Sequence, residues 1–224
     1  MPPRFASVIF DCDSTLAAIE GIDELAGPHR AAVARLTDAA MRGELPLEAV
    51  YGRRLDLIRP TRAAVDALSA RYVAALVPDA REAVAALHQA GVAVYIVSGG
   101  LLPPVLAAGR ALGIPDTNVA AVHIEFDDRG EYAGYDTSSP LAHQLGKRTV
   151  IERWAPPVPR PSLLVGDGAT DLAARPAVDA FAAYAGVAAR AAVIAAADVV
   201  FEHPSLAPVA AFALSHSPHD RSEP

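Results

Sequence analysis

Two aspartates with one residue between them, Asp11 and Asp13, follow directly after the apolar run SVIF at residues 7–10. Residues two apart on extended backbone share a face, so the two carboxylates can converge while Cys12 points elsewhere. One carboxylate can attack a phosphorus atom to form an aspartyl-phosphate, and the other can protonate the leaving alcohol and then activate water. Such a pair can therefore serve in phosphoryl transfer. The alternative interpretation is two solvated acids at the end of a strand.

Two further acids, Asp167 and Asp171, lie in the segment GDGATD, which follows the apolar run PSLLVG at 161–166. In an open parallel sheet, ligands bind outside the carboxyl ends of the strands, so acids at two strand ends can meet there. Carboxylates crowded at a dry site repel one another unless a cation or a proton relieves the repulsion. Oxygen donors without His or Cys are the ligands that Mg²⁺ prefers, and Mg²⁺ also binds substrate phosphate. The acids therefore predict a Mg²⁺ site.

A phosphate-binding loop is predicted at VSGG, where Ser98 offers a hydroxyl and Gly99 and Gly100 allow backbone N–H groups to approach a ligand. A helix is expected directly after these residues, so an anion would also meet a helix N-terminus. The alternative is an ordinary Gly-Gly turn between a strand and a helix.

A basic residue, Lys147, lies on a predicted helix before the third strand. Its ammonium could balance the charge of a phosphate and of the acidic cluster. The alternative is a lysine that faces solvent, and Arg148 beside it could replace it on a slightly rotated face.

The elements that must position these groups alternate along the chain. Short, continuous apolar runs fit parallel strands that are buried on both faces, and they occur at 7–10, 92–97, 161–166, 180–184 and 198–201. Helical patterns occur between them at 78–91, 101–113 and 140–154. Strands that alternate with helices predict an α/β fold with a doubly wound, Rossmann-like parallel sheet.

Two segments interrupt this alternation. Residues 16–75 contain no convincing strand and predict a cap of about three helices, inserted after the first strand. The β-rich halves of 121–136 flank the turn signal DDRG, which predicts a β-hairpin flap. The expected organisation is a phosphatase core of 1–15 and 76–214, a helical cap of 16–75, and a polar, frayed tail of 215–224.

The composition narrows the class of protein. The chain has 224 residues, a hydrophobic content of 52% and a net charge of −7, and this acidic balance argues against a nucleic-acid partner. Its one cysteine rules out an internal disulfide framework. The sequence contains neither an apolar run long enough to span a membrane nor a recognisable signal peptide, so a soluble, cytoplasmic protein without a membrane partner is expected.

The ordered set FDCDST, VSGG, Lys147 and GDGATD resembles the haloacid dehalogenase superfamily of phosphohydrolases, over roughly residues 5–205. The resemblance implies that Asp11 is the nucleophile and Asp13 the general acid and base. It implies that Ser98 and Lys147 bind the phosphoryl group. It also implies that Mg²⁺ is held by Asp11, Asp167 and the backbone carbonyl of Asp13, with Asp171 steadying the metal site.

The insert is similar to the helical cap of the phosphoserine phosphatases within this superfamily, in the stretches EGIDELAG (20–27) and MRGELPLEAVYGRRLDLI (41–58). This resemblance implies that Glu20 meets a substrate ammonium and that Arg54 pairs with a substrate carboxylate, a geometry that a guanidinium fork suits. Arg53 is the alternative carboxylate partner.

The same resemblance extends to the loops around the substrate, where it implies roles for Gly99 and Thr170 and places Arg190 near the site. The chain departs from the pattern at Leu47 and Leu101, where phenylalanine is common, and at Ile19, where an acid is common. The two leucines could alter how the cap packs and hence which substrate fits.

The motifs predict a Mg²⁺-dependent phosphomonoester hydrolase, and the resemblance implies that it converts the small molecule O-phosphoserine to serine and phosphate, as in serine biosynthesis. Three alternatives stay open. The substrate could be another small phosphorylated metabolite, the phosphoryl group could pass to an acceptor other than water, such as an alcohol, or the fold could serve as a non-catalytic module that binds a phosphate ligand.

Overall fold

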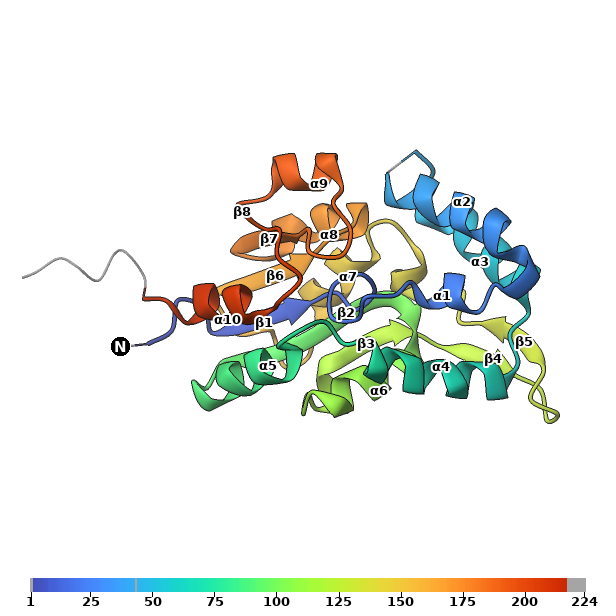
Figure 1. Ribbon diagram of the computed structural model, residues 1–224, viewed down its shortest axis with the longest axis horizontal. Coiled ribbons are helices and arrows are strands. Elements are labelled where there is room, and N and C mark those ends of the chain that lie inside the picture. The colour runs from blue at the N-terminus through green and yellow to red at the C-terminus, as the bar shows by residue number, and fades with distance from the viewer. Residues whose placement is uncertain (1, 43, 217–224) are drawn as a thin grey trace, which may run out of the picture.

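The computed structural model describes residues 2–42 and 44–216, and its centre is a six-stranded parallel sheet with the order β3-β2-β1-β6-β7-β8 (Figure 1). The strands are β1 (Ser7–Phe10), β2 (Ala93–Leu101), β3 (Val119–Val122), β6 (Ser162–Gly166), β7 (Ala180–Tyr184) and β8 (Val199–Phe201). Strand β1 pairs in parallel with β2 on one side and with β6 on the other. The chain therefore has the predicted α/β architecture.

Alternating side chains of each strand fill two cores, one on each face of the sheet. In β1, Val8 and Phe10 belong to one buried cluster, while Ile9 between them belongs to the other. The first cluster lies under helices α5 (Ala80–Gln89), α6 (Leu102–Ala111) and α10 (Ala207–Leu214), and the second under α7 (Gly146–Arg153), α8 (Ala169–Ala174) and α9 (Ala191–Ala196). Burial on both faces explains why the strand sequences are continuously apolar.

The insert between β1 and β2 is helical, as expected, and lies at the end of the sheet where the strands finish (Figure 1). It contains α1 (Gly21–Glu24), a 3₁₀ turn (Gly27–His29), α2 (Arg30–Met41), α3 (Leu47–Ile58) and α4 (Arg62–Ala74). Thr61 caps α4 by accepting a hydrogen bond from the Ala64 N–H at 3.2 Å. The segment that enters the insert and the segment that leaves it are hydrogen-bonded to each other: the Ala18 N–H donates to Ala75 O at 2.8 Å.

The predicted hairpin is present, but it is shorter than expected. Strands β4 (Ile124–Phe126) and β5 (Tyr132–Tyr135) pair in antiparallel fashion around the turn at 127–130. The first residues of the predicted hairpin belong instead to β3, a parallel edge strand that we did not predict from the sequence. Its sequence VAAV is half alanine, a weak strand former, and only one residue separates it from β4, so the two patterns merge.

Two other boundaries differ from the sequence-based expectation. Strand β2 continues through Ser98, Gly99 and Gly100 to Leu101, and its pairing with β3 becomes irregular in this stretch. Helix α7 begins only at Gly146, because 140–142 form a separate 3₁₀ turn. A Cβ on Gly146 would lie 1.8 Å from the carbonyl oxygen of Pro140, so a side chain there would displace this turn from the helix.

The remaining expectations concern the end of the chain and the membrane. Of the predicted frayed tail 215–224, residues 217–224 lie outside the described residues. Within the described ranges, no helix combines the length and the apolar character needed to cross a lipid bilayer.

Candidate active site

The site is built at the carboxyl ends of three adjacent strands. Asp11 follows β1, Ser98 lies near the end of β2, and Asp167 follows β6, so neighbouring strands bring the three sequence motifs to one edge. A small cavity of about 40 Å³ lies between this edge and the insert. It is lined by Asp11, Asp13, Glu20, Ile22, Leu47, Arg54, Ser98, Gly99, Lys147 and Thr170.

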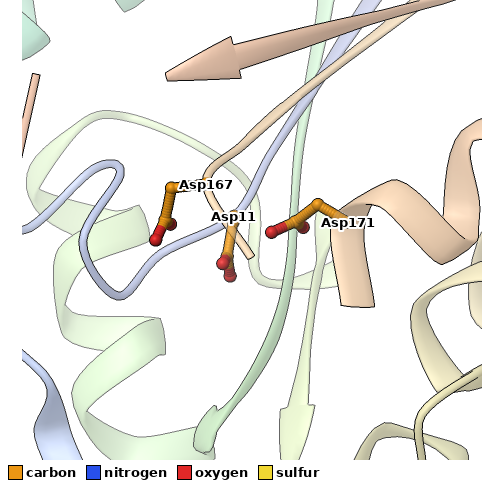
Figure 2. Close-up of side chains that lie close together, drawn as sticks. All are labelled: Asp11, Asp167 and Asp171. Atoms are coloured by element: carbon orange, nitrogen blue, oxygen red, sulfur yellow. The ribbon is translucent and has the colours of Figure 1, made fainter. Parts of the chain in front are cut away.

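Three of the predicted acids form a buried cluster. Each of Asp11, Asp167 and Asp171 offers a carboxylate oxygen, and these oxygens all lie within 4.8 Å of one another (Figure 2). Each side chain is also held by a donor: the Cys12 N–H bonds Asp11 at 2.7 Å, the Thr15 hydroxyl bonds Asp167 at 2.8 Å, and the Gly168 N–H bonds Asp171 at 2.9 Å. The cluster is therefore fixed in place by the loops that follow β1 and β6.

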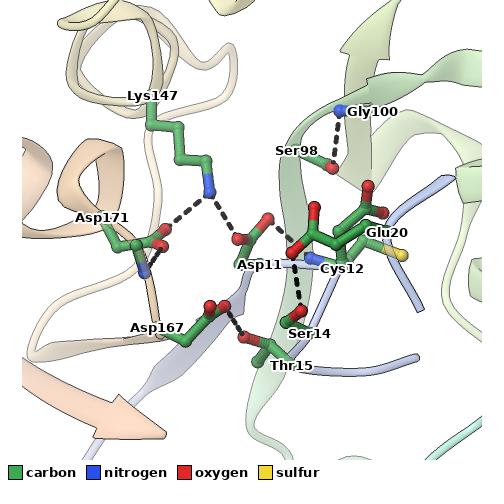
Figure 3. Close-up of polar contacts among 12 residues, drawn as sticks. Asp11, Cys12, Ser14, Thr15, Glu20, Ser98, Gly100, Lys147, Asp167 and Asp171 are labelled. Carbon is green, nitrogen blue, oxygen red and sulfur yellow. Dashed lines mark hydrogen bonds and ion pairs between the residues drawn. The ribbon is translucent and has the colours of Figure 1, made fainter. Parts of the chain in front are cut away.

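The ammonium of Lys147 joins two of these acids. Its Nζ lies 2.7 Å from Asp11 Oδ2 and 2.7 Å from Asp171 Oδ1, and only 4% of the residue is exposed (Figure 3). Burial alone would lower the pKa of Lys147, but the attraction of the two carboxylates outweighs it and raises that pKa above its usual range. The lysine therefore stays charged, and it is this residue, not Arg148, that faces the acids.

One signal for Lys147 was available in the sequence. The chain has 19 basic residues of the Lys and Arg types, and Lys147 is the only lysine among them. An ammonium is a compact point charge, whereas a guanidinium is a wide planar fork. A chain that uses arginine at its other Lys/Arg positions uses lysine where a cation lies between the buried carboxylates of Asp11 and Asp171.

The acids still outnumber the cations that touch them, and this imbalance fits a divalent metal. Burial and the repulsion of Asp11 raise the pKa of Asp171 to about 7, even though Lys147 is in contact with it. The donors are carboxylate oxygens alone, a set that suits Mg²⁺ more than the metals that prefer nitrogen or sulfur. The acidic cluster could therefore hold a Mg²⁺ ion.

Asp13 occupies a different environment from Asp11. Its Oδ1 accepts a hydrogen bond from the Tyr72 hydroxyl at 2.6 Å, and its Oδ2 accepts one from the Gly21 N–H at 3.1 Å. Burial, followed by repulsion from Glu20, raises the pKa of Asp13 to about 7. A carboxyl group with such a pKa can exchange a proton near neutral pH, as an acid and base catalyst must. Tyr72 was not recognised from the sequence, since nothing near it marks it as part of a site.

Glu20 lines the cavity on the side of the insert. Its Oε1 accepts a hydrogen bond from the Ser14 hydroxyl at 2.6 Å and lies 3.5 Å from Arg190 Nη2. Arg190 also forms an ion pair with Asp167, so it lies beside the site, where the resemblance placed it. Burial is the main cause of a raised pKa at Glu20, and a cationic group in the cavity would relieve the cost of its charge.

The structure separates the two neighbouring arginines of α3. Arg53 is exposed, whereas Arg54 is 4% exposed and lines the cavity. The Arg54 guanidinium donates from Nη1 to the Thr37 hydroxyl at 3.0 Å and lies over the ring of Tyr51, with 5.4 Å from Cζ to the ring centroid. Its Nε is buried and has no hydrogen-bond partner among the described residues.

The loop at 98–100, predicted to bind phosphate, has its own internal hydrogen bond. The Gly100 N–H donates to the Ser98 hydroxyl oxygen at 3.0 Å, and Gly100 does not itself line the cavity, unlike Gly99 (Figure 3). A Cβ on Gly100 would lie 3.3 Å from Asp13 Oδ1, so glycine keeps the strand close to that acid. Thr170, in α8, also lines the cavity.

The three apolar residues that depart from the family pattern, Leu47, Leu101 and Ile19, lie either at the cavity or in the cores on the two faces of the sheet. Leu47 lines the cavity together with Ile22, so it directly limits what fits there. Leu101 is buried in the core of the sheet, and Ile19 packs against the other core. Of these three positions, Leu47 is therefore the one that lines the cavity.

Cys12 is buried between the two aspartates of the first motif. Burial, reinforced by the charges of Asp13 and Asp11, raises the pKa of its thiol well above the usual range. The sulfur therefore stays protonated, and the thiolate that nucleophilic attack requires is not formed.

This fold and site define a hydrolase that acts on phosphate esters, because the carboxylates, the buried lysine and the glycine-bordered hydroxyl converge at one edge of a parallel sheet. Residues 5–179 match the haloacid dehalogenase-like hydrolase family, and the chain belongs to that family. Within it, the relatives identify the chain as a phosphomonoester hydrolase.

The curated relatives of the chain include phosphoserine phosphatases. The chain is 41% identical over 183 residues to that of Bos taurus, which covers 80% of this chain and 81% of the bovine enzyme. It is 37% identical over 207 residues to the chloroplastic enzyme of Arabidopsis thaliana, covering 89% of this chain and 70% of the plant one. A solved phosphoserine phosphohydrolase-like protein from Francisella tularensis superposes with a TM-score of 0.81 at 25% identity, covering 88% of this chain and 95% of that chain.

Proposed function

We propose that the chain hydrolyses O-phosphoserine to serine and phosphate with the help of Mg²⁺ and through an aspartyl-phosphate on Asp11. One observation carries the proposal. A single cavity is lined by the acid pair Asp11 and Asp13 and also by an acidic group, Glu20, and a buried guanidinium, Arg54. These last two groups complement the ammonium and the carboxylate of a phosphorylated amino acid.

In the first step, a carboxylate oxygen of Asp11 attacks the phosphorus atom of the ester. The bond between phosphorus and the serine oxygen breaks, and Asp13 in its neutral form gives its proton to that oxygen. The raised pKa of Asp13, about 7, keeps a useful fraction of the acid form at neutral pH. Lys147, fixed 2.7 Å from Asp11, supplies positive charge beside the transferring group.

In the second step, Asp13 has become a carboxylate and takes a proton from a water molecule. The water oxygen attacks the phosphorus, the bond to Asp11 breaks, and inorganic phosphate leaves with the Asp11 carboxylate restored. Both acids thus return to their starting states, which explains why the site uses two aspartates, one as the nucleophile and one as the acid and base.

We assign the metal site to Asp11, Asp167 and the backbone carbonyl of Asp13, steadied by Asp171. A bound Mg²⁺ would neutralise the charge that collects on the phosphoryl oxygens. Of these residues, Asp11, Asp167 and Asp171 already lie together, and the excess of acids over cations in this cluster favours a divalent ion.

The remaining residues are assigned to the substrate. We assign the phosphoryl group to Lys147 and the loop groups of Ser98, Gly99, Gly100 and Thr170. We assign the ammonium group of the substrate to Glu20, whose own carboxylate accepts a hydrogen bond from Ser14. We assign the carboxylate of the substrate to Arg54 and not to the exposed Arg53.

The helical insert, residues 16–75, would act as a cap over the core formed by 1–15 and 76–214. The cavity of about 40 Å³ is small and lies between the two, so substrate entry and product release require the cap to move. A closed cap also keeps bulk water from the acyl-phosphate until one water is positioned.

The test is a panel of phosphate esters assayed with Mg²⁺ and compared by kcat/KM. The panel contains O-phosphoserine, O-phosphothreonine, O-phosphoethanolamine, glycerol phosphate and a sugar phosphate. O-Phosphoserine should be the best substrate, EDTA should abolish phosphate release, and Asp11→Asn should be inactive. A higher kcat/KM for an ester without amino and carboxyl groups would refute the assignment, and loss of substrate without release of phosphate would show that another acceptor is used.

A further inference from the structure

A chain of two hydrogen bonds holds Arg54 from behind the cavity. Thr37 on α2 donates its hydroxyl proton to Asp23 Oδ1 on α1 at 2.7 Å and accepts a hydrogen bond from Arg54 Nη1 on α3 at 3.0 Å. Thr37 is 3% exposed and does not line the cavity, so it touches the arginine without facing the substrate space. Three helices of the insert are thus tied together at one hydroxyl group.

The direction of these bonds is fixed by the chemistry of the groups. A hydroxyl has one proton, and the Asp23 carboxylate can only accept, so the Thr37 proton points to Asp23. A lone pair of the same oxygen therefore faces the guanidinium, which can only donate. Asp23 orients Thr37, and Thr37 in turn orients Arg54.

These two hydrogen bonds leave other N–H donors of the Arg54 guanidinium free to bind a substrate. Among the described residues, Arg54 makes one side-chain hydrogen bond, from Nη1, and its buried Nε has no partner. A direct ion pair with Asp23 would occupy the donors that a substrate carboxylate needs, whereas the intervening hydroxyl supplies negative potential and spares them. The ring of Tyr51 packs against the guanidinium and restricts it further.

We propose that Thr37 is a positioning residue that sets the preference of this enzyme for substrates with a carboxylate. It holds the guanidinium of Arg54 in one orientation before the substrate arrives, so binding does not have to restrict a free arginine side chain. The inference rests on the proposed function in one respect, namely that Arg54 receives the carboxylate of O-phosphoserine.

The experiment compares two substrates that differ by that group. O-Phosphoserine and O-phosphoethanolamine share the phosphate and the ammonium, and only the first has a carboxylate. The ratio of their kcat/KM values is measured for the wild type and for Thr37→Val, which keeps the shape of the side chain and removes the hydroxyl. Thr37→Ser restores the hydroxyl, Arg54→Ala removes the guanidinium, and Arg53→Ala is the matched control on the exposed neighbour.

The expected result is a fall of roughly tenfold in the ratio for Thr37→Val, the size expected for losing a hydrogen bond to a charged group. It should appear in KM for O-phosphoserine with kcat little changed, since the contact lies away from the reacting atoms. Thr37→Ser should recover most of the ratio, Arg54→Ala should lower it further, and Arg53→Ala should leave it unchanged. Thermal melting of each variant verifies that it is folded, and Thr37→Ala replaces Thr37→Val if the latter is not.

The outcomes separate this inference from the proposed function. If Arg54→Ala lowers the ratio and Thr37→Val leaves it unchanged, the positioning role is wrong and the proposed substrate stands. An equal loss on both substrates in Thr37→Val, unrepaired by Thr37→Ser, indicates a merely structural role and also overturns the inference. If Arg54→Ala leaves the ratio unchanged, the carboxylate assignment itself fails, and the inference fails with it.

Discussion

The hydroxyl of Tyr72 donates a hydrogen bond to Asp13 Oδ1 at 2.6 Å, across 59 residues of sequence. Tyr72 lies in the last turn of α4, close to the point where the insert returns to the core, and it is fully buried. The second oxygen of Asp13 is bonded by the Gly21 N–H at the start of α1. Both donors to the proposed acid catalyst therefore come from the insert and not from the sheet.

This arrangement predicts that Tyr72→Phe weakens the acid catalyst specifically. An alkyl leaving group such as serine needs a proton, whereas p-nitrophenolate leaves readily without one. We expect kcat/KM to fall roughly tenfold for O-phosphoserine, the size expected for losing one bond to a charged group, and much less for p-nitrophenyl phosphate. The comparison uses kcat/KM because it reports the steps up to transfer of the phosphoryl group to Asp11. Equal losses on both substrates would contradict a role for Tyr72 in positioning Asp13.

A second prediction concerns the space that Tyr72 requires. A Cβ on Gly21 would lie 2.0 Å from the Tyr72 hydroxyl oxygen and 2.8 Å from Cζ. Gly21→Ala should therefore lower the free energy of unfolding by about 2 kcal/mol, as overpacking does, and should also reduce activity. The loss should be smaller when Gly21→Ala is introduced into Tyr72→Phe, because the clashing oxygen is gone.

Urea denaturation of the two single variants and the double variant measures this coupling. Gly52→Ala is the matched control, since a Cβ there would lie 3.1 Å from the hydroxyl of Tyr135 and requires only a small adjustment. Strict additivity of the Gly21 and Tyr72 effects would show that the two side chains do not compete for the same space.

The pH dependence of kcat/KM should report the environment of Asp13. Its pKa is raised to about 7, so the acid form needed in the first step is lost as the pH rises through that value. Glu20 raises this pKa by repulsion, and the bond from Tyr72 lowers it. Glu20→Gln should therefore shift the alkaline limb to lower pH, and Tyr72→Phe should shift it to higher pH.

The measurement is a pH profile of kcat/KM for O-phosphoserine in the wild type and in both variants. Glu24→Gln serves as the control, because Glu24 forms its ion pairs with Arg30 and Arg71 and does not line the cavity. Shifts of the limb in the same direction for Glu20→Gln and Tyr72→Phe would show that Asp13 is not the group that titrates.

The sequence predicted the position of those site residues that the order of the strands brings together. Parallel strands end at a common edge, so motifs after three apolar runs could be brought together without knowing any contact, and Asp11, Ser98 and Asp167 do lie on neighbouring strands. The helical insert and the hairpin were also predictable from their local patterns. The edge strand β3 was not, because its short, alanine-rich sequence carries little local preference.

Thr37 and Tyr72 could not have been found in this way. Each acts through a partner on another element, 17 residues away for Thr37 and Arg54 and 59 residues away for Tyr72 and Asp13. Their own surroundings in the sequence are those of ordinary helices. Such contacts are set by how the helices of the insert pack, and single-sequence patterns do not describe that packing.

Replacing Lys147 separates the need for its charge from the need for its shape. Lys147→Met leaves Asp11 and Asp171 without their buried cation, so the free energy of unfolding should fall by about 3 kcal/mol and activity should be lost. Lys147→Arg keeps the charge, but a planar guanidinium does not fit where one Nζ lies 2.7 Å from both acids. We expect it to be inactive as well. Urea denaturation and kcat/KM measure the two effects, and wild-type activity in Lys147→Arg would contradict the argument from shape.

The metal assignment can be tested without measuring catalysis. Only the folded chain brings Asp11, Asp167 and Asp171 together, so a ligand of this cluster stabilises the folded state by mass action. Mg²⁺ should therefore raise the melting temperature of the wild type in a concentration-dependent way, and EDTA should reverse the effect. Asp167→Asn should lose most of the response, because it removes a charged ligand from the cluster. Asp116→Asn is the matched control: Asp116 forms an exposed ion pair with Arg110 away from the site, and its response to Mg²⁺ should equal that of the wild type. An equal rise in the melting temperature of Asp167→Asn would show that Mg²⁺ binds elsewhere.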